Sequence, residues 1–302
     1  MLKKSLFFYL ILAFFSQSQL FPQTEPKVLV AIAHPDDDAV FAATVYKISF
    51  DLNGSVDYLL ITNGEGGYKY STLSERIYGL ELTDEKTGRE NLPQIRKKEL
   101  EEGGAIIGVK NYYYLNQKDH KYTNDIDEVL DSVWNVTYVK NFISDLVTKN
   151  KYDYIFVLLP TYTTHAHHSS TGILVLEAVN NLDKDVRPVV LGGTVRNLND
   201  TNYFYKGLKE YPLTSFTNDS LIFQFDRTQK FGFNDRLNYK IIVNWLIAEH
   251  KSQGTMQLLM NAGDLETYYF FDMNDKAKVE QVKKLFERLK ENKFPKKEYD
   301  EN

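Results

Sequence analysis

Between residues 27 and 195 the chain repeats one pattern, in which a run of apolar residues of strand length is followed by a longer segment with helical spacing. Strands that are apolar on both faces are typical of a parallel sheet covered by helices on two sides. The pattern therefore predicts an α/β fold with a mainly parallel sheet between two helical layers. The predicted strands are 27–33, 56–62, 111–115, 152–160 and 187–195.

The predicted helices separate these strands, and the pattern weakens after about residue 196. A strand at 220–226 and two helices complete the chain. Residues 68–92 are long for a loop, and such loops are often lids or binding loops. The helix after this loop is expected to have Pro93 near its first turn. The predicted helices are 38–52, 92–109, 135–150, 169–182, 235–253 and 275–292.

Residues 1–18 have the layout of a secretory signal: Lys3 and Lys4, an apolar run, and then small residues. The sequence therefore predicts export to the periplasm or the medium, and no integral membrane span once the signal is removed. Residues 24–302 are predicted to form one domain with a C-terminal helical extension. The net charge of −5 and the lack of a basic block argue against a nucleic-acid partner.

Polar clusters follow three of the predicted strands. They are "HPDDD" at 34–38, "NGEGG" at 63–67 and "TYTTHAHHSS" at 161–170. Four of the six histidines of the chain lie in the first and third clusters. Because ligands of open parallel sheets bind at the carboxyl ends of the strands, these clusters predict one shared site.

Histidine and aspartate are the ligands of catalytic divalent metals, which take three protein ligands and leave a position open for water. His34 and Asp37 are three residues apart, so both can face one ion, and the "HAHH" segment can supply the third ligand. Such a metal lowers the pKa of a water molecule, and Asp36 would remain free as the base. A small-molecule or glycan substrate fits such a site.

Simpler interpretations exist for the same residues. Aspartates at a strand-to-helix junction often cap the helix, which is the role expected for Asp38. The "HAHH" segment alone could be a surface cluster, and "NGEGG" alone could be only a turn. His120 and His250 are isolated in the sequence and are expected to be structural. The joint placement of two clusters at strand ends favours a functional site.

The sequence resembles the PIG-L / LmbE-like family of zinc-dependent N-acetylglucosaminyl de-N-acetylases. "AHPDDD" is similar to the family's AHPDDE signature, and "ITNGEGG" is similar to the turn after its second strand. "IRKKELEEGGAIIGV", "HAHH" and "KIIVNWLIAEHKSQ" resemble three further family elements. The resemblance covers roughly residues 27–254, and the order of the five elements makes it specific.

The resemblance implies a Rossmann-like sheet and hydrolysis of an N-acetyl group with Zn²⁺ or another divalent metal such as Fe²⁺. It implies three kinds of site residue: metal ligands at His34, Asp37 and His168; a general base at Asp36, with His165 stabilising the oxyanion or protonating the amine; and sugar contacts at Arg96, Asp119 and Glu65.

Three departures from the family pattern stand out. Asp38 replaces the usual glutamate, and His167 replaces the aspartate common between the two outer histidines of "HAHH", which changes the charge beside a ligand. The 68–92 segment is longer than in the shorter family members.

The sequence thus predicts an exported N-deacetylase of an N-acetylglucosamine-type sugar or glycoconjugate. A metallohydrolase of another amide or ester, or a non-catalytic glycan-binding protein on the same scaffold, are the alternatives.

Overall fold

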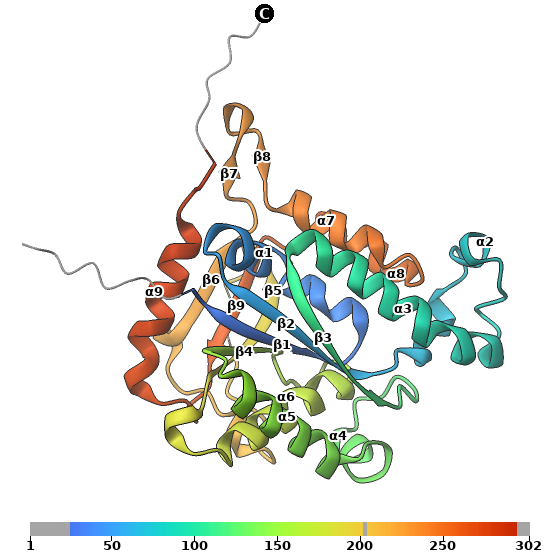
Figure 1. Cartoon of the computed structure of the whole chain (residues 1–302), viewed down its shortest axis with the longest axis horizontal. Coiled ribbons are helices and arrows are strands. Elements are labelled where there is room, and N and C mark those ends of the chain that lie inside the picture. Colours follow the sequence, from blue (N-terminus) through green and yellow to red (C-terminus); the bar gives the residue numbers. More distant parts are fainter. Residues whose placement is uncertain (1–24, 202–203, 295–302) are drawn as a thin grey trace, which may run out of the picture.

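The computed structural model describes residues 25–201 and 204–294 (Figure 1). The predicted signal, residues 1–18, lies outside the described residues, and export stays a prediction. A seven-stranded sheet forms the centre, with the strand order β3-β2-β1-β4-β5-β9-β6. The strands of this sheet are β1 (Lys27–Ile32), β2 (Ser55–Thr62), β3 (Val109–Gln117), β4 (Tyr154–Leu158), β5 (Val189–Arg196), β6 (Ile222–Asp226) and β9 (Leu265–Phe270).

Strands β1 to β5 run parallel, as expected for strands joined by helical crossovers. Strand β9 pairs antiparallel with both β5 and β6 and so adds an antiparallel edge. A separate two-stranded ribbon consists of β7 (Lys230–Phe231) and β8 (Leu237–Asn238).

Helices cover both faces of the sheet (Figure 1). Helix α3 (Glu85–Ile107) packs with α1 (Ala42–Tyr46) and α7 (Lys240–Glu249) on one face. Helix α6 (Ala166–Asn180) packs with α5 (Val136–Asn150) and the short α4 (Ile126–Glu128) on the other. The predicted three-layer α/β fold with a mainly parallel sheet is confirmed.

Three helices lie outside these two groups. Helix α9 (Val279–Lys290), the predicted C-terminal helix, packs against β6 through its apolar stripe, with Phe286 stacked on Phe223. The other two are α2 (Glu75–Tyr78) and α8 (Gly254–Gln257). None of the helices in the described part of the chain is long and apolar enough to cross a membrane.

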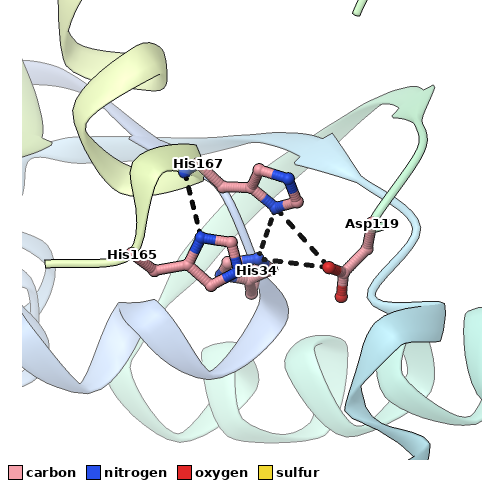
Figure 2. A group of neighbouring side chains, drawn as sticks. All are labelled: His34, Asp119, His165 and His167. Atoms are coloured by element: carbon pink, nitrogen blue, oxygen red, sulfur yellow. Dashed lines mark hydrogen bonds and ion pairs between the residues drawn. The ribbon is translucent and has the colours of Figure 1, made fainter. Parts of the chain in front are cut away.

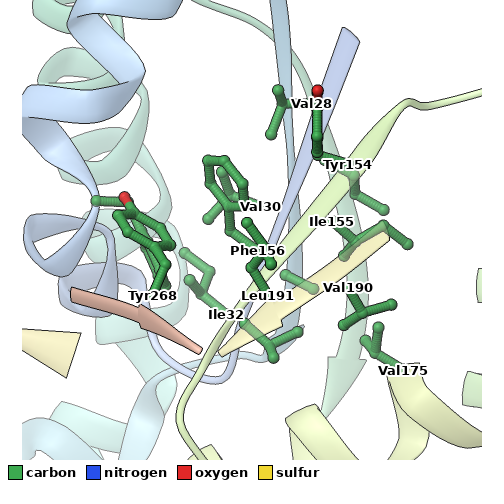
Figure 3. Close-up of a cluster of buried hydrophobic side chains, with 14 of the residues drawn as sticks. Val28, Val30, Ile32, Tyr154, Ile155, Phe156, Val175, Val190, Leu191 and Tyr268 are labelled. Carbon is green, nitrogen blue, oxygen red and sulfur yellow. The ribbon is translucent and has the colours of Figure 1, made fainter. Parts of the chain in front are cut away.

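The apolar core lies on both faces of the central strands (Figure 3). Ile155 and Val190 lie toward Val175 of α6, whereas Phe156 lies toward Tyr268 of β9, with ring centroids 5.0 Å apart. Because successive side chains of a strand point to opposite faces, a continuous apolar run such as β4 supplies both halves of this core. The runs read from the sequence therefore become the buried centre of the sheet.

Helix α3 begins earlier than predicted. Asp84 is its N-cap, and its carboxylate accepts the N–H of Thr87 at 2.9 Å. Pro93 consequently lies inside the helix rather than in its first turn. The expected loop 68–92 is also partly wrong, because it contains α2 and the first turns of α3.

The segment after β1 also differs from the predicted helix 38–52. A 3₁₀ helix, Pro35–Val40, comes first, then α1, then a π turn at Lys47–Asp51. The expected capping role of Asp38 is wrong, because α1 begins only at Ala42. The carboxylate of Glu266 on β9 accepts the N–H groups of Ala43 and Thr44, each at 2.9 Å, and caps α1 instead.

The strand order reverses direction between β1 and β4. From β1 the chain adds β2 and β3 toward one edge, whereas β4 and β5 lie on the other side of β1. Such a switch point opens a crevice at the carboxyl ends of the two strands. The "HPDDD" and "HAHH" segments follow β1 and β4, so both are delivered to this crevice.

Candidate metal centre and active site

Three side chains from the two segments form a compact group. His34 Nδ1 is 3.1 Å from His168 Nε2, and His168 Nε2 is 3.0 Å from an Asp37 oxygen. The second Asp37 oxygen is 3.6 Å from His34 Nδ1. Two imidazoles and a carboxylate facing one point are a donor set suited to zinc or a similar transition metal. The structure thus brings the three predicted metal ligands together.

The backbone and a hydroxyl hold these ligands in orientation. The N–H groups of Ala33 and His34 donate to one Asp37 oxygen at 3.0 and 2.8 Å. The Oγ1 of Thr164 lies 2.8 Å from His168 Nδ1. If His168 Nδ1 carries its proton toward Thr164, the lone pair of Nε2 is free for a metal. This supporting role of Thr164 is not visible in the sequence motif.

Asp36 points away from the three ligands and toward α3. One of its oxygens accepts a hydrogen bond from an Arg96 Nη at 2.6 Å, and Arg96 also donates to the carbonyl of Gly64 at 2.7 Å. Arg96 is buried, whereas the Asp36 side chain is 22% exposed. Asp37 therefore lies in the group of predicted metal ligands, whereas the neighbouring Asp36 is accessible to solvent, as expected from the sequence.

The other edge of the His34 ring faces a second group (Figure 2). His34 Nε2 lies 3.0 Å from His167 Nδ1 and 3.7 Å from an Asp119 oxygen. His167 Nε2 lies 3.0 Å from His120 Nδ1. The expectation that His120 is isolated is therefore wrong, because β3 delivers it to the histidines after β4.

His165 is the N-cap of α6. Its Nδ1 accepts the N–H of His167 at 3.1 Å, so a neutral His165 ring carries its proton on Nε2. Burial, followed by the charges of His34 and His168, lowers the pKa of His165 to about 3. The chain therefore holds His165 as a neutral donor.

Carboxylates dominate the electrostatics of the centre. Burial acts to lower the pKa of His34, but Asp119 and Asp37 outweigh it and raise that pKa to about 9. Burial alone would raise the pKa of Asp37, but His168 and His34 lower it well below its usual range. Positive charge is thus strongly favoured at this point, as a cation site requires.

The site opens into a cavity of about 570 Å³. Arg96 and Asp119, two of the predicted sugar contacts, lie on its wall. Arg96 donates a hydrogen bond to Asp36, however, and Asp119 faces the histidines. Glu65, the third, begins a 3₁₀ turn and is not among the described residues that line the cavity. The wall also includes Tyr68 and Arg89, so the 68–92 segment contributes to the cavity.

His250 and Asp38 form a buried pair beneath the site. His250 Nε2 lies 2.9 Å from an Asp38 oxygen, and both side chains are at most 1% exposed. Burial acts to lower the pKa of His250, but Asp38 raises it above its usual value. Burial raises the pKa of Asp38, although His250 opposes this. His250 is thus buried, and its partner is the residue that was expected to cap a helix.

The family described as PIG-L: GlcNAc-PI de-N-acetylase matches residues 29–179, which contain most of β1, all of β2 to β4 and both ligand segments. The chain belongs to the PIG-L family. The predicted family is confirmed.

A relative of known sequence agrees with this assignment. The probable N-acetyl-alpha-D-glucosaminyl L-malate deacetylase 2 of Bacillus cereus is 28% identical over 167 residues, which is 55% of this chain and 66% of that relative. The match therefore spans slightly less than two thirds of the relative.

Two solved structures share the fold. The conserved protein TT1542 from Thermus thermophilus is 15% identical and has a TM-score of 0.51, with 80% of this chain and 93% of that chain covered. The A40926 pseudoaglycone deacetylase Dbv21 is 13% identical and has a TM-score of 0.50, with coverage of 83% and 99%.

Proposed function

We propose that this chain is an exported, metal-dependent hydrolase that removes the N-acetyl group of an N-acetylglucosamine-type sugar or glycoconjugate. Membership of the PIG-L family supports the reaction, and the name of the Bacillus cereus relative supports the sugar class. Export rests on the sequence of residues 1–18 alone. The proposal names Zn²⁺ as the metal, held by His34, Asp37 and His168.

One observation carries the proposal: a solvent-accessible carboxylate lies directly beside the metal-ligand group. Asp36 is held by Arg96 and lines the same cavity as His34, Asp37 and His168. A protein that only bound a glycan would need no base at this point. Hydrolysis of an amide needs one, because the attacking water must lose a proton.

The residues of the site have separate roles in the proposed reaction. A divalent cation bound at this group would lower the pKa of a water and polarise the acetyl carbonyl. Asp36, oriented by Arg96, accepts the proton of the attacking water. The Nε2–H of His165 donates to the oxygen on which negative charge develops. Asp36 then returns its proton to the departing amine, which completes the proton balance.

The decisive experiment is a screen for acetate release from a panel of N-acetylated saccharides, with zinc present and with zinc chelated. The proposal expects release that depends on zinc. The matched variant is Asp36→Ala, for which turnover should fall about 10²- to 10⁴-fold while zinc content stays the same.

Two results would count against the proposal. The first is a zinc-loaded protein that releases no acetate from any saccharide but releases another acyl group, which would indicate a different amide or ester hydrolase. The second is an Asp36→Ala protein with normal turnover, which would remove the assigned base.

A further inference from the structure

The second group around His34 is arranged like a metal site in its own right. His34, Asp119, His165 and His167 each offer one ligand atom, and these four atoms lie within 4.8 Å of one another. Figure 2 shows the three rings and the carboxylate gathered at one point. The group meets His34 on Nε2, whereas the predicted catalytic ligands meet it on Nδ1.

The distances within this group match a tetrahedral cation. His34 Nε2 and His167 Nδ1 are 3.0 Å apart, and the Asp119 oxygen lies 3.7 and 3.5 Å from them. Metal bonds of about 2.0–2.1 Å at tetrahedral angles place the ligand atoms roughly 3.4 Å apart. A cation can therefore lie between these three atoms with shifts of only a few tenths of an ångström.

Further contacts aim these ligand atoms inward. The N–H of Gly66 donates to the second Asp119 oxygen at 3.0 Å, which leaves the first oxygen facing the imidazoles. His120 occupies Nε2 of His167, which leaves its Nδ1 for the group. His34, Asp119 and His167 are only 7%, 4% and 0% exposed. Buried ligands with such supporting contacts characterise built metal sites.

We propose that His34, Asp119 and His167 bind a second divalent cation, with the His34 ring shared between the two metals. His165, whose Nδ1 accepts the N–H of His167, is not a ligand of this cation and keeps its Nε2–H. Two imidazoles and one carboxylate favour Zn²⁺ or a similar transition metal over Mg²⁺ or Ca²⁺. The cation would displace the proton on His34 Nε2, which is released to solvent. A cation can reach the group from the cavity, because two of its three ligands, His34 and Asp119, line the cavity.

A single-metal arrangement explains the same distances differently. His34 would then donate its Nε2–H to His167 Nδ1, and His167 would donate its Nε2–H to His120. In that arrangement His167 only orients a ligand of the first metal. The two arrangements differ in the number of metals that the chain binds, so counting metals decides between them.

The test is equilibrium dialysis of the purified full-length chain against a series of zinc concentrations, followed by elemental analysis. The proposal expects two zinc ions per chain for the wild type. His167→Ala and His168→Ala should each bind one, because each removes a ligand of a different site. His120→Gln is the matched control and should keep two, because glutamine retains a hydrogen-bond acceptor for His167 Nε2–H and residue 120 ligates neither metal.

Asp119→Asn provides a second variant in case His167→Ala does not fold, and it should also bind one. A wild-type chain that saturates at one zinc overturns the proposal, and so do His167→Ala and Asp119→Asn chains that bind as much zinc as the wild type. The count uses no substrate, so a protein with one zinc that releases acetate would retain the proposed function and lose only the second site.

Discussion

At the scale of single residues, Thr164 decides how His168 can act. Its Oγ1 lies 2.8 Å from His168 Nδ1, which favours the tautomer with a free lone pair on Nε2. The Thr164 hydroxyl contacts a predicted ligand rather than the metal itself, and such contacts tune the affinity of a site for its metal.

We expect Thr164→Val to weaken zinc binding at the first site about 10-fold, because valine keeps the shape of the side chain but cannot accept a hydrogen bond from His168 Nδ1–H. Competition with a chromophoric chelator measures this change. The nearby Thr163→Val is the control and should leave affinity unchanged. Equal affinities for the Thr164→Val and wild-type proteins would show that the hydroxyl does not orient the ligand.

The Asp38–His250 pair links residues 212 positions apart under the site. Because the folded pKa of His250 is raised, its contribution to the free energy of unfolding is full below about pH 6.5 and is lost as the pH rises through the folded value. His250→Gln removes this titration while it keeps a hydrogen-bond donor.

We therefore expect the stability advantage of the wild type over His250→Gln to shrink as the pH rises above about 6.5. Urea unfolding at a series of pH values measures it. An advantage that stays constant or grows with pH over this range would contradict the raised pKa of His250.

At the scale of elements, β9 holds the "HPDDD" segment, which carries two of the predicted ligands, in position. Glu266 on β9 accepts two N–H groups at the start of α1 and pairs with Arg227 at 3.0 Å. Arg227 in turn donates to the carbonyls of Ala39 and Val40, at the end of the 3₁₀ helix. The antiparallel edge of the sheet thus anchors the "HPDDD" segment from behind.

Glu266→Gln should destabilise the fold by about 3–5 kcal/mol, because it leaves the buried Arg227 without its counter-charge. Chemical denaturation measures the loss. Glu280→Gln, in the exposed Lys283–Glu280 pair of α9, is the control and should change stability by less than about 1 kcal/mol. Similar small losses for both variants would mean that the buried pair contributes little.

At the scale of the whole molecule, the candidate ligands join elements from both halves of the parallel sheet. Asp37 follows β1 and His168 lies in the first turn of α6, so a cation bound to both would join segments more than a hundred residues apart. Since the unfolded chain cannot present these ligands together, binding of a metal to them would contribute to the free energy of folding.

We expect zinc at about 100 times its dissociation constant to stabilise the chain by about 2.7 kcal/mol, and chelation to remove this gain. In thermal unfolding this corresponds to a Tm difference of roughly 5 °C. The variant His168→Ala should show little zinc-dependent shift from the first site. A wild-type Tm that is the same with zinc and with chelator would contradict a metal site built into the fold.

Much of the architecture could be read from local patterns. The apolar run 27–33 predicted β1, and the run at 152–160 predicted β4, because each strand is buried on both faces. Strand β9 is not predicted, because "LETYYF" lies in a region where the pattern weakens and contains the charged residue Glu266. Glu266 is nevertheless buried, where it forms an ion pair with Arg227. Boundaries were missed where a cap such as Asp84 begins a helix ahead of its apolar face.

The sequence by itself determined the parallel sheet and the meeting of "HPDDD" with "HAHH", because strand order along the chain and polar residues at strand ends are local signals. Only the tertiary structure decided that Asp38 pairs with His250, that Glu266 caps α1, and that His120 and Asp119 join the histidines. These contacts depend on how distant segments pack, and packing partners leave no periodic trace in the chain. For that reason the residues around His34 Nε2, where the second metal site is proposed, could be recognised only from the tertiary structure.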